Sequence, residues 1–365
     1  MRMKALLAAS SAVLTAAACL TAAGPVQAHA GRAGHRPAPV AAAGRCSDSV
    51  TLDGFSDALD KTTFQGAFVG NFSALAPDAH GTLDALSDRS ALFTLSGRTP
   101  DDVRPQKVVP LADEKGQPLD SEALVVDRDG TRLVTSEVEP SIRRYSRDGG
   151  TLLGSLPVPR ELRVAPAGRA TGNLTFEGLA LQPDGRTLVA SMEGALAGDD
   201  PTTVRFQTWR RVGSGRDFRL GPQYAYRVDT DAHGTVLGVS ESAAAGDGRL
   251  LVLERGFTSG VGNTIRLYLA DPSRATDVSG VTDLTGHQGV RFVRRTLLAD
   301  VGDCPSLGAT AKQPQPNPLL DNIEGMAVTG HEPGGRLRLL MVSDDNQGAT
   351  QTTRFYALTV RLPRR

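Results

Sequence analysis

The sequence lacks the features that mark several large classes of protein. Lys plus Arg and Asp plus Glu each number 40 in 365 residues, and aromatic residues make up only 5%. Nucleic acid is therefore disfavoured as a partner, because neither a basic excess nor an aromatic platform is present. No Gly-x-Ser-x-Gly motif occurs, which leaves a serine-triad hydrolase with little support. Since the net charge is zero, any electrostatic site must be local.

Only one long apolar run occurs, at the start of the chain. Arg2 and Lys4 precede an Ala- and Leu-rich segment over residues 5–23, and small-x-small patterns end at Ala28 and Ala30. This arrangement predicts a secretory signal peptide over residues 1–30, a secreted, extracellular protein and no transmembrane span. Lipidation of Cys19 stays open as an alternative. Residues 31–45, rich in Pro, Ala, Gly and Arg, predict a disordered leader.

Cysteine is scarce, with three in the whole chain. Removal of the signal peptide leaves Cys46 and Cys304, and an even number in an exported chain predicts a disulfide. Two unrelated thiols are the alternative. A thiolate metal site is disfavoured, because neither residue has a Cys or His neighbour at ligand spacing.

Short strands separated by tight turns run along most of the chain, and no helical period is present. Apolar or alternating runs cover residues 131–136, 142–145, 151–156, 187–191, 250–254, 265–269, 337–343 and 353–360. Between them lie Asp-Gly and Gly-Gly pairs, which supply the positive φ angles of hairpin turns. These features predict an all-β fold, which can be a sandwich, a barrel or a propeller.

A repeat decides among these three folds. Each copy has a carboxylate, a small residue and an aliphatic, then a hairpin turn, then a strand that ends in another acid. Four copies cover residues 121–137, 176–193, 240–255 and 323–346, and a fainter one covers 73–89 without the first acid. The uneven spacing of the copies suits a propeller, whose loops tolerate insertions. We predict a β-propeller of six blades, with seven as the alternative, over residues 46–365.

The first strand of each propeller blade lines the central axis, so equivalent acids converge there. Glu122, Glu177, Glu241 and Glu324 occupy equivalent positions in the repeat, and Asp344 and Asp345 follow a strand end. Crowded carboxylates repel one another, and a bound divalent cation removes that penalty. The sequence predicts these six acids as metal ligands, with Ca²⁺ preferred and Mg²⁺ next.

Roles beyond metal binding are assigned to a few of these residues and their neighbours. We predict Glu177 and Glu324 as catalytic, and Arg89, Arg255 and Asn346 as the residues that bind an anionic ester. Each has a structural alternative: a glutamate before Gly-Leu can bond to backbone amides of the next blade, and each arginine can pair with a neighbouring acid.

Four motifs, in order, resemble a known family. Residues 173–185 (NLTFEGLALQPDG) with 191–194 (SMEG), then 251–257 (LVLERGF), 321–326 (DNIEGM) and 342–346 (VSDDN), are similar to the phytase-like family, described as "esterase-like activity of phytase". The resemblance spans about residues 64–358. The first copy departs from the family pattern, because residues 71–75 read NFSAL where Gly-Leu-Ser-Gly-Leu is usual. The resemblance implies an exported bacterial β-propeller and calcium-assisted cleavage of phosphate esters.

Three functions stay open at this point. The first is a secreted, monomeric, calcium-assisted hydrolase of a small anionic phosphate ester at an acidic central channel. The second is a non-catalytic extracellular propeller that binds a ligand or partner and carries structural calcium. The third is a lactonase-like esterase on the same scaffold, which shares the metal but changes the electrophile. Fold alone does not separate them.

Overall fold

The computed structural model describes residues 44–286 and 289–364. The predicted signal peptide lies outside these residues, as does the predicted leader up to residue 43. The last two leader positions form a short strand, β1 (Gly44–Arg45). No helix in the described part of the chain combines the length and apolar character needed to cross a membrane.

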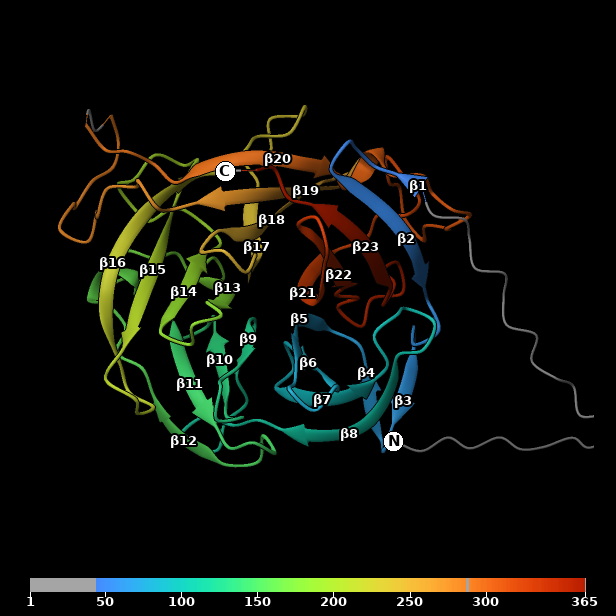
Figure 1. The fold of residues 1–365 in the computed structure, drawn as a ribbon, viewed down its shortest axis with the longest axis horizontal. Helices are drawn as coiled ribbons and strands as arrows, with labels where there is room; N and C mark the ends of the chain where they lie inside the picture. Colours follow the sequence, from blue (N-terminus) through green and yellow to red (C-terminus); the bar gives the residue numbers. More distant parts are fainter. Residues whose placement is uncertain (1–43, 287–288, 365) are drawn as a thin grey trace, which may run out of the picture. The chain divides into compact units, whose positions relative to one another are not determined.

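The described residues form a β-propeller of five blades (Figure 1). Blades 1 to 4 are four-stranded antiparallel sheets whose strands follow chain order from the axis outwards. Blade 1 contains β5 (Phe72–Pro77), β6 (Leu83–Ser87), β7 (Ala91–Ser96) and β8 (Arg104–Pro110), and blade 2 contains β9 (Leu124–Val126), β10 (Arg132–Ser136), β11 (Ser141–Tyr145) and β12 (Leu152–Ser155). Blade 3 contains β13 (Phe176–Leu181), β14 (Thr187–Met192), β15 (Thr203–Arg211) and β16 (Phe218–Arg227), and blade 4 contains β17 (Gly238–Ala244), β18 (Leu250–Thr258), β19 (Gly262–Asp271) and β20 (Arg294–Asp300).

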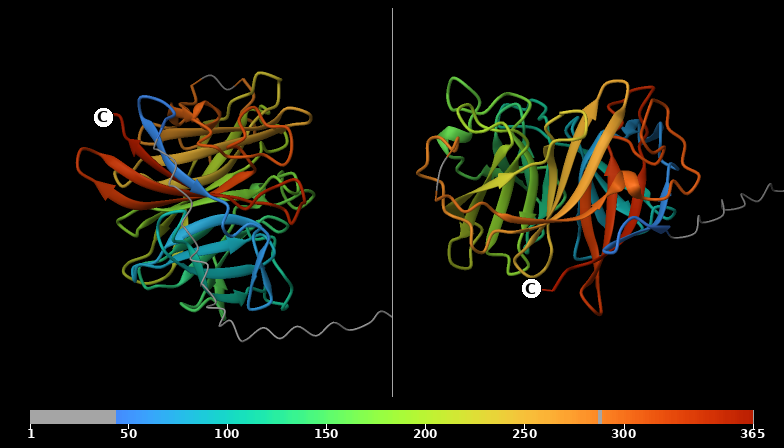
Figure 2. Two further views of the ribbon diagram at one scale, coloured as in Figure 1. Left: turned by 90° about the vertical axis from the view of Figure 1, so that its right-hand side faces the viewer. Right: turned by 90° about the horizontal axis from the view of Figure 1, so that it is seen from above.

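Blade 5 joins the two ends of the described chain. Strands β21 (Ile323–Glu332), β22 (Arg336–Ser343) and β23 (Phe355–Arg361) follow chain order, and β2 (Val50–Ser56) pairs with β23 as the next strand outwards. Figure 2 shows β2, in blue, beside the red C-terminal strands. The predicted disulfide between Cys46 and Cys304 is confirmed, so a covalent bond adds to the hydrogen bonds that close the ring.

The remaining elements lie outside the blades. A small hairpin, β3 (Thr62–Phe64) and β4 (Ala67–Val69), precedes blade 1. Two short 3₁₀ turns, η1 (Arg160–Leu162) and η2 (Val301–Asp303), lie in the connections that follow blades 2 and 4.

The all-β propeller prediction is confirmed, but the predicted count of six blades is wrong. The extra chain length lies in long strands and connections. Blade 4 contains a nine-residue strand and a ten-residue strand, and the described residues of the segments 272–293 and 301–322 form no further blade strand. Dividing the chain length by an average blade length therefore overestimated the number of blades.

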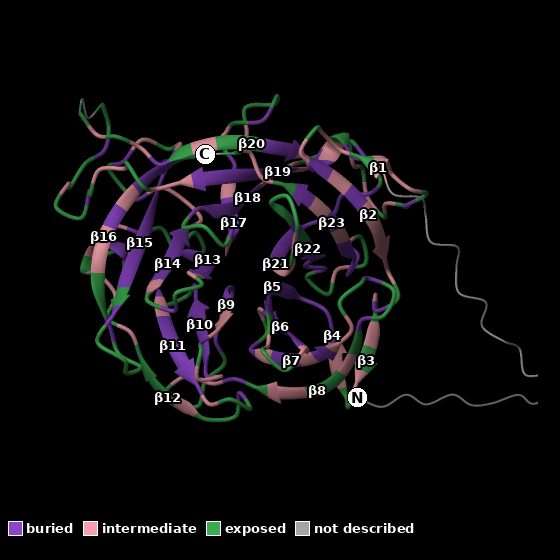
Figure 3. Cartoon of the chain, viewed as in Figure 1, coloured by how far each residue is buried: buried purple, intermediate pink, exposed green. Residues whose placement is uncertain are grey.

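Aliphatic and aromatic side chains fill the spaces between neighbouring blades. Phe72 of blade 1, for example, contacts Phe93 in its own blade and Phe355 in blade 5 edge to face. Trp209 is fully buried, and its indole N–H donates to the carbonyl of Pro157 at 2.8 Å. Figure 3 shows that the inner and middle strands are mostly buried and that the loops are exposed. The inner strands are thus held firmly around the axis.

Candidate functional site

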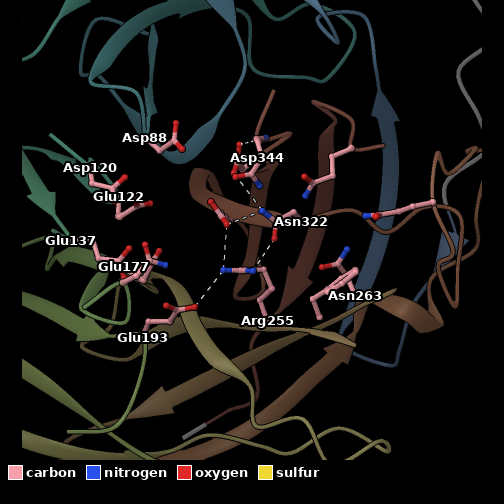
Figure 4. Close-up of a pocket in the computed structure, with 16 residues that line it drawn as sticks. Asp88, Asp120, Glu122, Glu137, Glu177, Glu193, Arg255, Asn263, Asn322 and Asp344 are labelled. Atoms are coloured by element: carbon pink, nitrogen blue, oxygen red, sulfur yellow. Dashed lines mark hydrogen bonds and ion pairs between the residues drawn. The ribbon is translucent and has the colours of Figure 1, made fainter. Parts of the chain in front are cut away.

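A cavity of about 480 Å³ lies where the inner strands begin, and carboxylates dominate its wall (Figure 4). Its acids come from four of the five blades. They are Asp88, Asp120, Glu122, Glu137, Glu177, Glu193, Glu324 and Asp344. Among the described residues that line this cavity, Arg255 is the only cationic side chain.

A β-bulge at the start of the inner strand directs Glu177 of blade 3 and Glu324 of blade 5 toward this cavity. In blade 3 the register shifts between Phe176 and Gly178, which leaves Glu177 without a pairing partner. The same shift leaves out Glu324 in blade 5 and Ser73 in blade 1, and in blade 2 Glu122 lies two residues before the first residue of β9. A bulge re-aims a side chain that a regular strand would direct elsewhere.

Glycine follows the bulged glutamate in two blades because the inner strands approach each other closely. A Cβ atom on Gly178 would lie 2.7 Å from the backbone nitrogen of Ser242 in the neighbouring blade. A Cβ atom on Gly325 would lie 3.2 Å from the backbone of Ala74. The Glu-Gly pairs in the repeat therefore combine a cavity-facing acid with a close contact between blades.

The second strand of each blade contributes another residue to the cavity, just after the strand end in blades 1, 2, 3 and 5 and within β18 in blade 4. These residues are Asp88, Glu137, Glu193, Arg255 and Asp344. The four acids are held alike, because the backbone N–H of each donates to a carbonyl that lies two residues before the bulged position. These bonds run from Asp88 to Asn71, from Glu137 to Asp120, from Glu193 to Thr175 and from Asp344 to Asn322.

Burial and mutual repulsion raise the pKa of these carboxyls above ordinary values. Burial, then the charge of Asp344, raises the pKa of Asp88 to about 7. Burial, then the charge of Glu324, raises that of Asp344 to about 8. The pKa of Glu177 is raised well above its usual range, first by burial and then by Glu122 and Glu193. Ionising all of these groups together is unfavourable unless positive charge is added.

Arg255 and Asn322 link the acids from neighbouring blades. The Arg255 guanidinium lies 3.4 Å from Glu193 and 3.3 Å from Glu324, and it donates to the Asn322 side-chain oxygen at 2.9 Å. The Asn322 amide nitrogen donates to Glu324 at 2.9 Å and to Asp344 at 3.4 Å. The Nε atom of Arg255 is buried and has no hydrogen-bond partner among the described residues.

Two groups of three acids bring their oxygens close enough to share a metal ion. One group is Asp120, Glu122 and Glu137, and the other is Glu137, Glu177 and Glu193. In each group one oxygen per residue lies within 4.8 Å of the other two. Glu137 belongs to both groups, so the two candidate metal positions are neighbours.

The predicted equivalence of Glu241 with the other three glutamates is wrong. In blade 4 the register shift lies between Val239 and Glu241, so Ser240 takes the bulged position and Glu241 stands where blades 3 and 5 have glycine. Its carboxylate accepts hydrogen bonds from the backbone N–H groups of Leu179 at 3.2 Å and Ser242 at 2.8 Å. Glu241 lines a separate cavity with aliphatic neighbours.

Asp345 and Arg89 also lie away from the acidic cavity. Asp345 is fully buried, pairs with Lys61 and accepts the backbone N–H of Asn71 at 3.0 Å. Arg89 is mostly exposed and lies beside Asp88 on a surface groove. In the strand pairing of blade 4, Arg255 occupies the position that Asp88 occupies in blade 1, whereas Arg89 lies one residue further along the chain. Asn346 does line the cavity, and its backbone N–H donates to Asp344 at 2.8 Å.

Asp120 and Asn322 were not among the predicted site residues. Each lies two residues before a cavity-lining glutamate, Glu122 or Glu324, and each lines the cavity. Both precede the inner strand of their blade, so the only signal in the sequence was a polar residue at this spacing from the repeated glutamate. Glu137 and Glu193, the acids that end two copies of the repeat, were also not among the six predicted metal ligands.

A sequence model of the phytase-like family, described as "Esterase-like activity of phytase", matches residues 67–347. The chain belongs to the phytase-like family. A curated relative, named an uncharacterized secreted protein from Arthroderma benhamiae, is 29% identical over 118 residues. That match covers 26% of this phytase-like chain and 23% of the relative, so most of the relative lies outside it.

Two solved propellers are similar in fold at low identity. The PQQ-bound aldose sugar dehydrogenase from Streptomyces coelicolor has a TM-score of 0.39 and 15% identity, over 87% of this chain and all of that one (100%). A luciferin-regenerating enzyme has a TM-score of 0.38 and 11% identity, over 80% of this chain and 95% of that one. We draw nothing about the function of this phytase-like chain from either.

Proposed function

We propose that this protein is a secreted, calcium-assisted hydrolase of phosphate esters that acts in the acidic cavity on the propeller axis. The observation that carries the proposal is the pair of carboxylate triads joined at Glu137 beside the guanidinium of Arg255. The excess of acids in the cavity would attract cations, and the nearby arginine would bind an anionic group. Membership of the phytase-like family supports the same reaction class.

The donor set fits a hard cation. Both triads offer only carboxylate oxygens, which are the ligands that Ca²⁺ and Mg²⁺ prefer. Glu122 and Glu177 are buried and crowded by other acids, and the resulting rise in pKa is the penalty that a cation relieves. Asp120, Glu122 and Glu137 would hold one ion, and Glu137, Glu177 and Glu193 a second. Bound calcium would supply the positive charge that attracts the ester and activates water.

Arg255 is the residue proposed to bind the anionic group. A guanidinium recognises phosphate oxygens through several N–H donors. Its contacts with Glu193 and Glu324 are longer than strong ion pairs, and its Nε atom has no partner among the described residues. A phosphate oxygen that reached this atom would satisfy it.

Glu324 is the residue proposed to move a proton. It lines the cavity and contacts Arg255, but it belongs to neither triad. It can therefore accept a proton from the attacking water or return one to the leaving alcohol. Asn322 orients it through the hydrogen bond at 2.9 Å. Glu177, the other residue predicted as catalytic, would act by holding the cation.

Localisation and partners belong to the same proposal. The predicted signal peptide, the disulfide and a relative named as secreted support export. The partner proposed is a small anionic ester bound by a monomer, because the candidate site lies within a single chain.

An assay on two ester classes tests the proposal. Protein purified without the predicted signal peptide would be given a phosphate monoester and a carboxylic ester, each with calcium and with chelator. We expect phosphate release that the chelator abolishes and that Glu177→Gln lowers by about 100-fold or more. Glu139→Gln is the matched control, because that glutamate is mostly exposed.

The other outcomes separate the alternatives. Turnover of the carboxylic ester without turnover of the phosphate ester would reject the phosphatase function and support a lactonase-like esterase. No turnover of either ester, with calcium still raising the melting temperature, would establish the non-catalytic propeller with structural calcium instead.

A further inference from the structure

The wall of the acidic cavity changes character on the far side of Arg255. In Figure 4 the acids Glu122, Glu137 and Glu177 lie on one side of Arg255, and Asn263 lies on the other. The uncharged residues Phe257, Gln313 and Gln351 line the same cavity as Asn263, and Phe257 pairs with Asn263 across neighbouring strands. We call this set the amide wall. Nothing in the calcium chemistry above uses it.

Asn263 has no hydrogen-bond partner for its side chain. The residue is 1% exposed, and both Oδ1 and Nδ2 are without a partner among the described residues. Leaving a buried amide unpaired costs free energy. Because Asn263 lines the cavity, a group bound there can supply the missing donor and acceptor.

Phe257 lies directly beside Asn263. The two residues face each other across the ladder between β18 and β19, so their side chains share one face of the sheet. Phe257 is 49% exposed, although most large apolar residues of the protein are buried. An exposed aromatic ring next to an unpaired amide provides an apolar face and hydrogen bonds at one place.

The loop that carries Gln313 is held firmly against this pair. The backbone N–H of Asn263 donates to the Gln315 side chain at 2.8 Å. Gly262 permits that approach, because its φ is +114° and a Cβ atom there would lie 2.4 Å from the same oxygen. On the other flank, Lys312 binds Asp60 and donates to the carbonyl of Gln351 at 3.3 Å.

A buried arginine fastens the rest of this loop. Arg354 donates to the carbonyls of Thr310, Pro318 and Leu319, each at 2.9 Å, and the disulfide at Cys304 anchors the start of the loop. The amide wall is therefore preorganised, which lowers the entropic cost of binding.

We propose that the amide wall is a subsite for an uncharged, hydroxyl-bearing ring, such as a sugar, carried by the same substrate whose anionic group binds at Arg255. This inference rests on the proposed function. Amide side chains offer both donors and acceptors, as hydroxyl groups do. A flat base would require two apolar faces, and Phe257 is the only aromatic residue among the described residues that line the cavity.

The charge balance limits the number of anionic groups on this substrate. Arg255 is the only cationic side chain among the described residues that line the cavity, and Lys61 and Lys312 are paired with Asp345 and Asp60. A substrate with a phosphate on every ring position would bring its negative charges against the amide wall, where no cation lies. The site therefore fits a monoester of a polyhydroxylated alcohol.

A binding comparison tests the subsite separately from catalysis. Dissociation constants for ethylphosphonate and for a hexose 6-phosphonate, which contain no ester bond, would be measured by calorimetry with calcium present. We expect the hexose compound to bind about tenfold tighter or better, since several hydrogen bonds are added. Asn263→Leu should reduce this preference to about twofold or less without lowering the melting temperature, because the replaced amide has no partner to lose.

Gln182→Leu is the matched control, since Gln182 has a side-chain oxygen that is buried and unpaired among the described residues and lies at the cavity that Glu241 lines. The preference of this variant for the hexose compound should equal that of the native protein. An equal affinity of the native protein for the two phosphonates would overturn the subsite, even if phosphate esters are hydrolysed. A retained preference in Asn263→Leu would also overturn it. Preference for the hexose compound without any ester turnover would support the subsite and reject the hydrolase.

Discussion

The two cavities along the propeller axis are built from the same inner strands but differ in chemistry. At one end, acids from four blades surround Arg255. At the other, aliphatic residues such as Leu75, Leu124 and Leu179 surround one carboxylate, Glu241. A single carboxylate can be held by the backbone N–H groups of Leu179 and Ser242. The eight carboxylates at the acidic end repel one another, and added positive charge would relieve that repulsion. The number of acids, more than their burial, therefore distinguishes the candidate functional end.

The largest expected effect comes from the acid shared by both triads. Glu137→Gln should lower calcium-dependent ester hydrolysis by about 100-fold or more and weaken calcium binding at both positions. The amide keeps an oxygen for the backbone N–H of Thr175, which Glu137 now accepts at 3.0 Å, so the fold should survive. Steady-state kinetics and circular dichroism check both statements. Activity within threefold of the native value would remove Glu137 from the account.

A smaller effect is expected when only one triad is changed. Asp120→Asn touches the first triad and Glu193→Gln the second, so each should remove one calcium ion and leave the other. Calorimetric stoichiometry in the two variants measures this. Loss of both ions in both variants would show that the acids form one undivided site.

The acidic end also predicts how stability depends on pH when calcium is removed. The pKa values of Asp88 and Glu137 are raised to about 7 and that of Asp344 to about 8, in each case chiefly by burial, whereas unfolded carboxyls ionise near about 4. Between about pH 4 and these raised pKa values, the folded state therefore binds more protons than the unfolded state does. The stabilisation is complete below about pH 4 and is lost as the pH rises through 7 to 8.

Melting in chelator should thus occur several degrees lower at pH 8 than at pH 5, and added calcium should raise the melting temperature most at pH 8. Differential scanning calorimetry at both pH values is the measurement. A melting temperature in chelator that rises steadily from pH 5 to pH 8 would contradict the predicted repulsion.

The smallest effect on activity is expected at the aliphatic end. Glu241→Leu leaves the backbone N–H groups of Leu179 and Ser242 without their acceptor, which should cost about 2 kcal/mol of unfolding free energy. The specific activity of the folded protein should change by less than about threefold. Urea denaturation and kinetics would show both. A large loss of activity at unchanged stability would return Glu241 to the metal site.

Much of the fold was readable from the sequence. Alternating runs, Asp-Gly turns and the repeated acid motifs placed the strands β10, β14 and β22 close to their observed bounds. The pairing of β2 with β23 was not predicted, because β2 carries no repeat motif and its partner lies at the other end of the chain. The blade count was wrong because the length between Glu241 and Glu324 is taken up by long strands and connections.

The candidate site was only partly readable, for a reason that lies in the bulges. Glu177, Glu324 and Arg255 do line one cavity, and the roles predicted for them stay predictions. The position of Glu241 depends on how β17 pairs with β18, which a single strand sequence does not reveal. Asp120 was missed because it precedes both β9 and the repeat copy, which begins at residue 121.

In the proposed function, acids from separate blades share cations on the propeller axis, and a calcium titration is the sharpest experiment on that sharing. Chelator-treated protein would be titrated with calcium by calorimetry at pH 7, in two buffers that differ in ionisation enthalpy. We expect two calcium ions to bind per chain and protons to be released on binding, because raised pKa values leave several of the acids protonated. Absence of binding at millimolar calcium, or binding without proton release, would contradict the proposal.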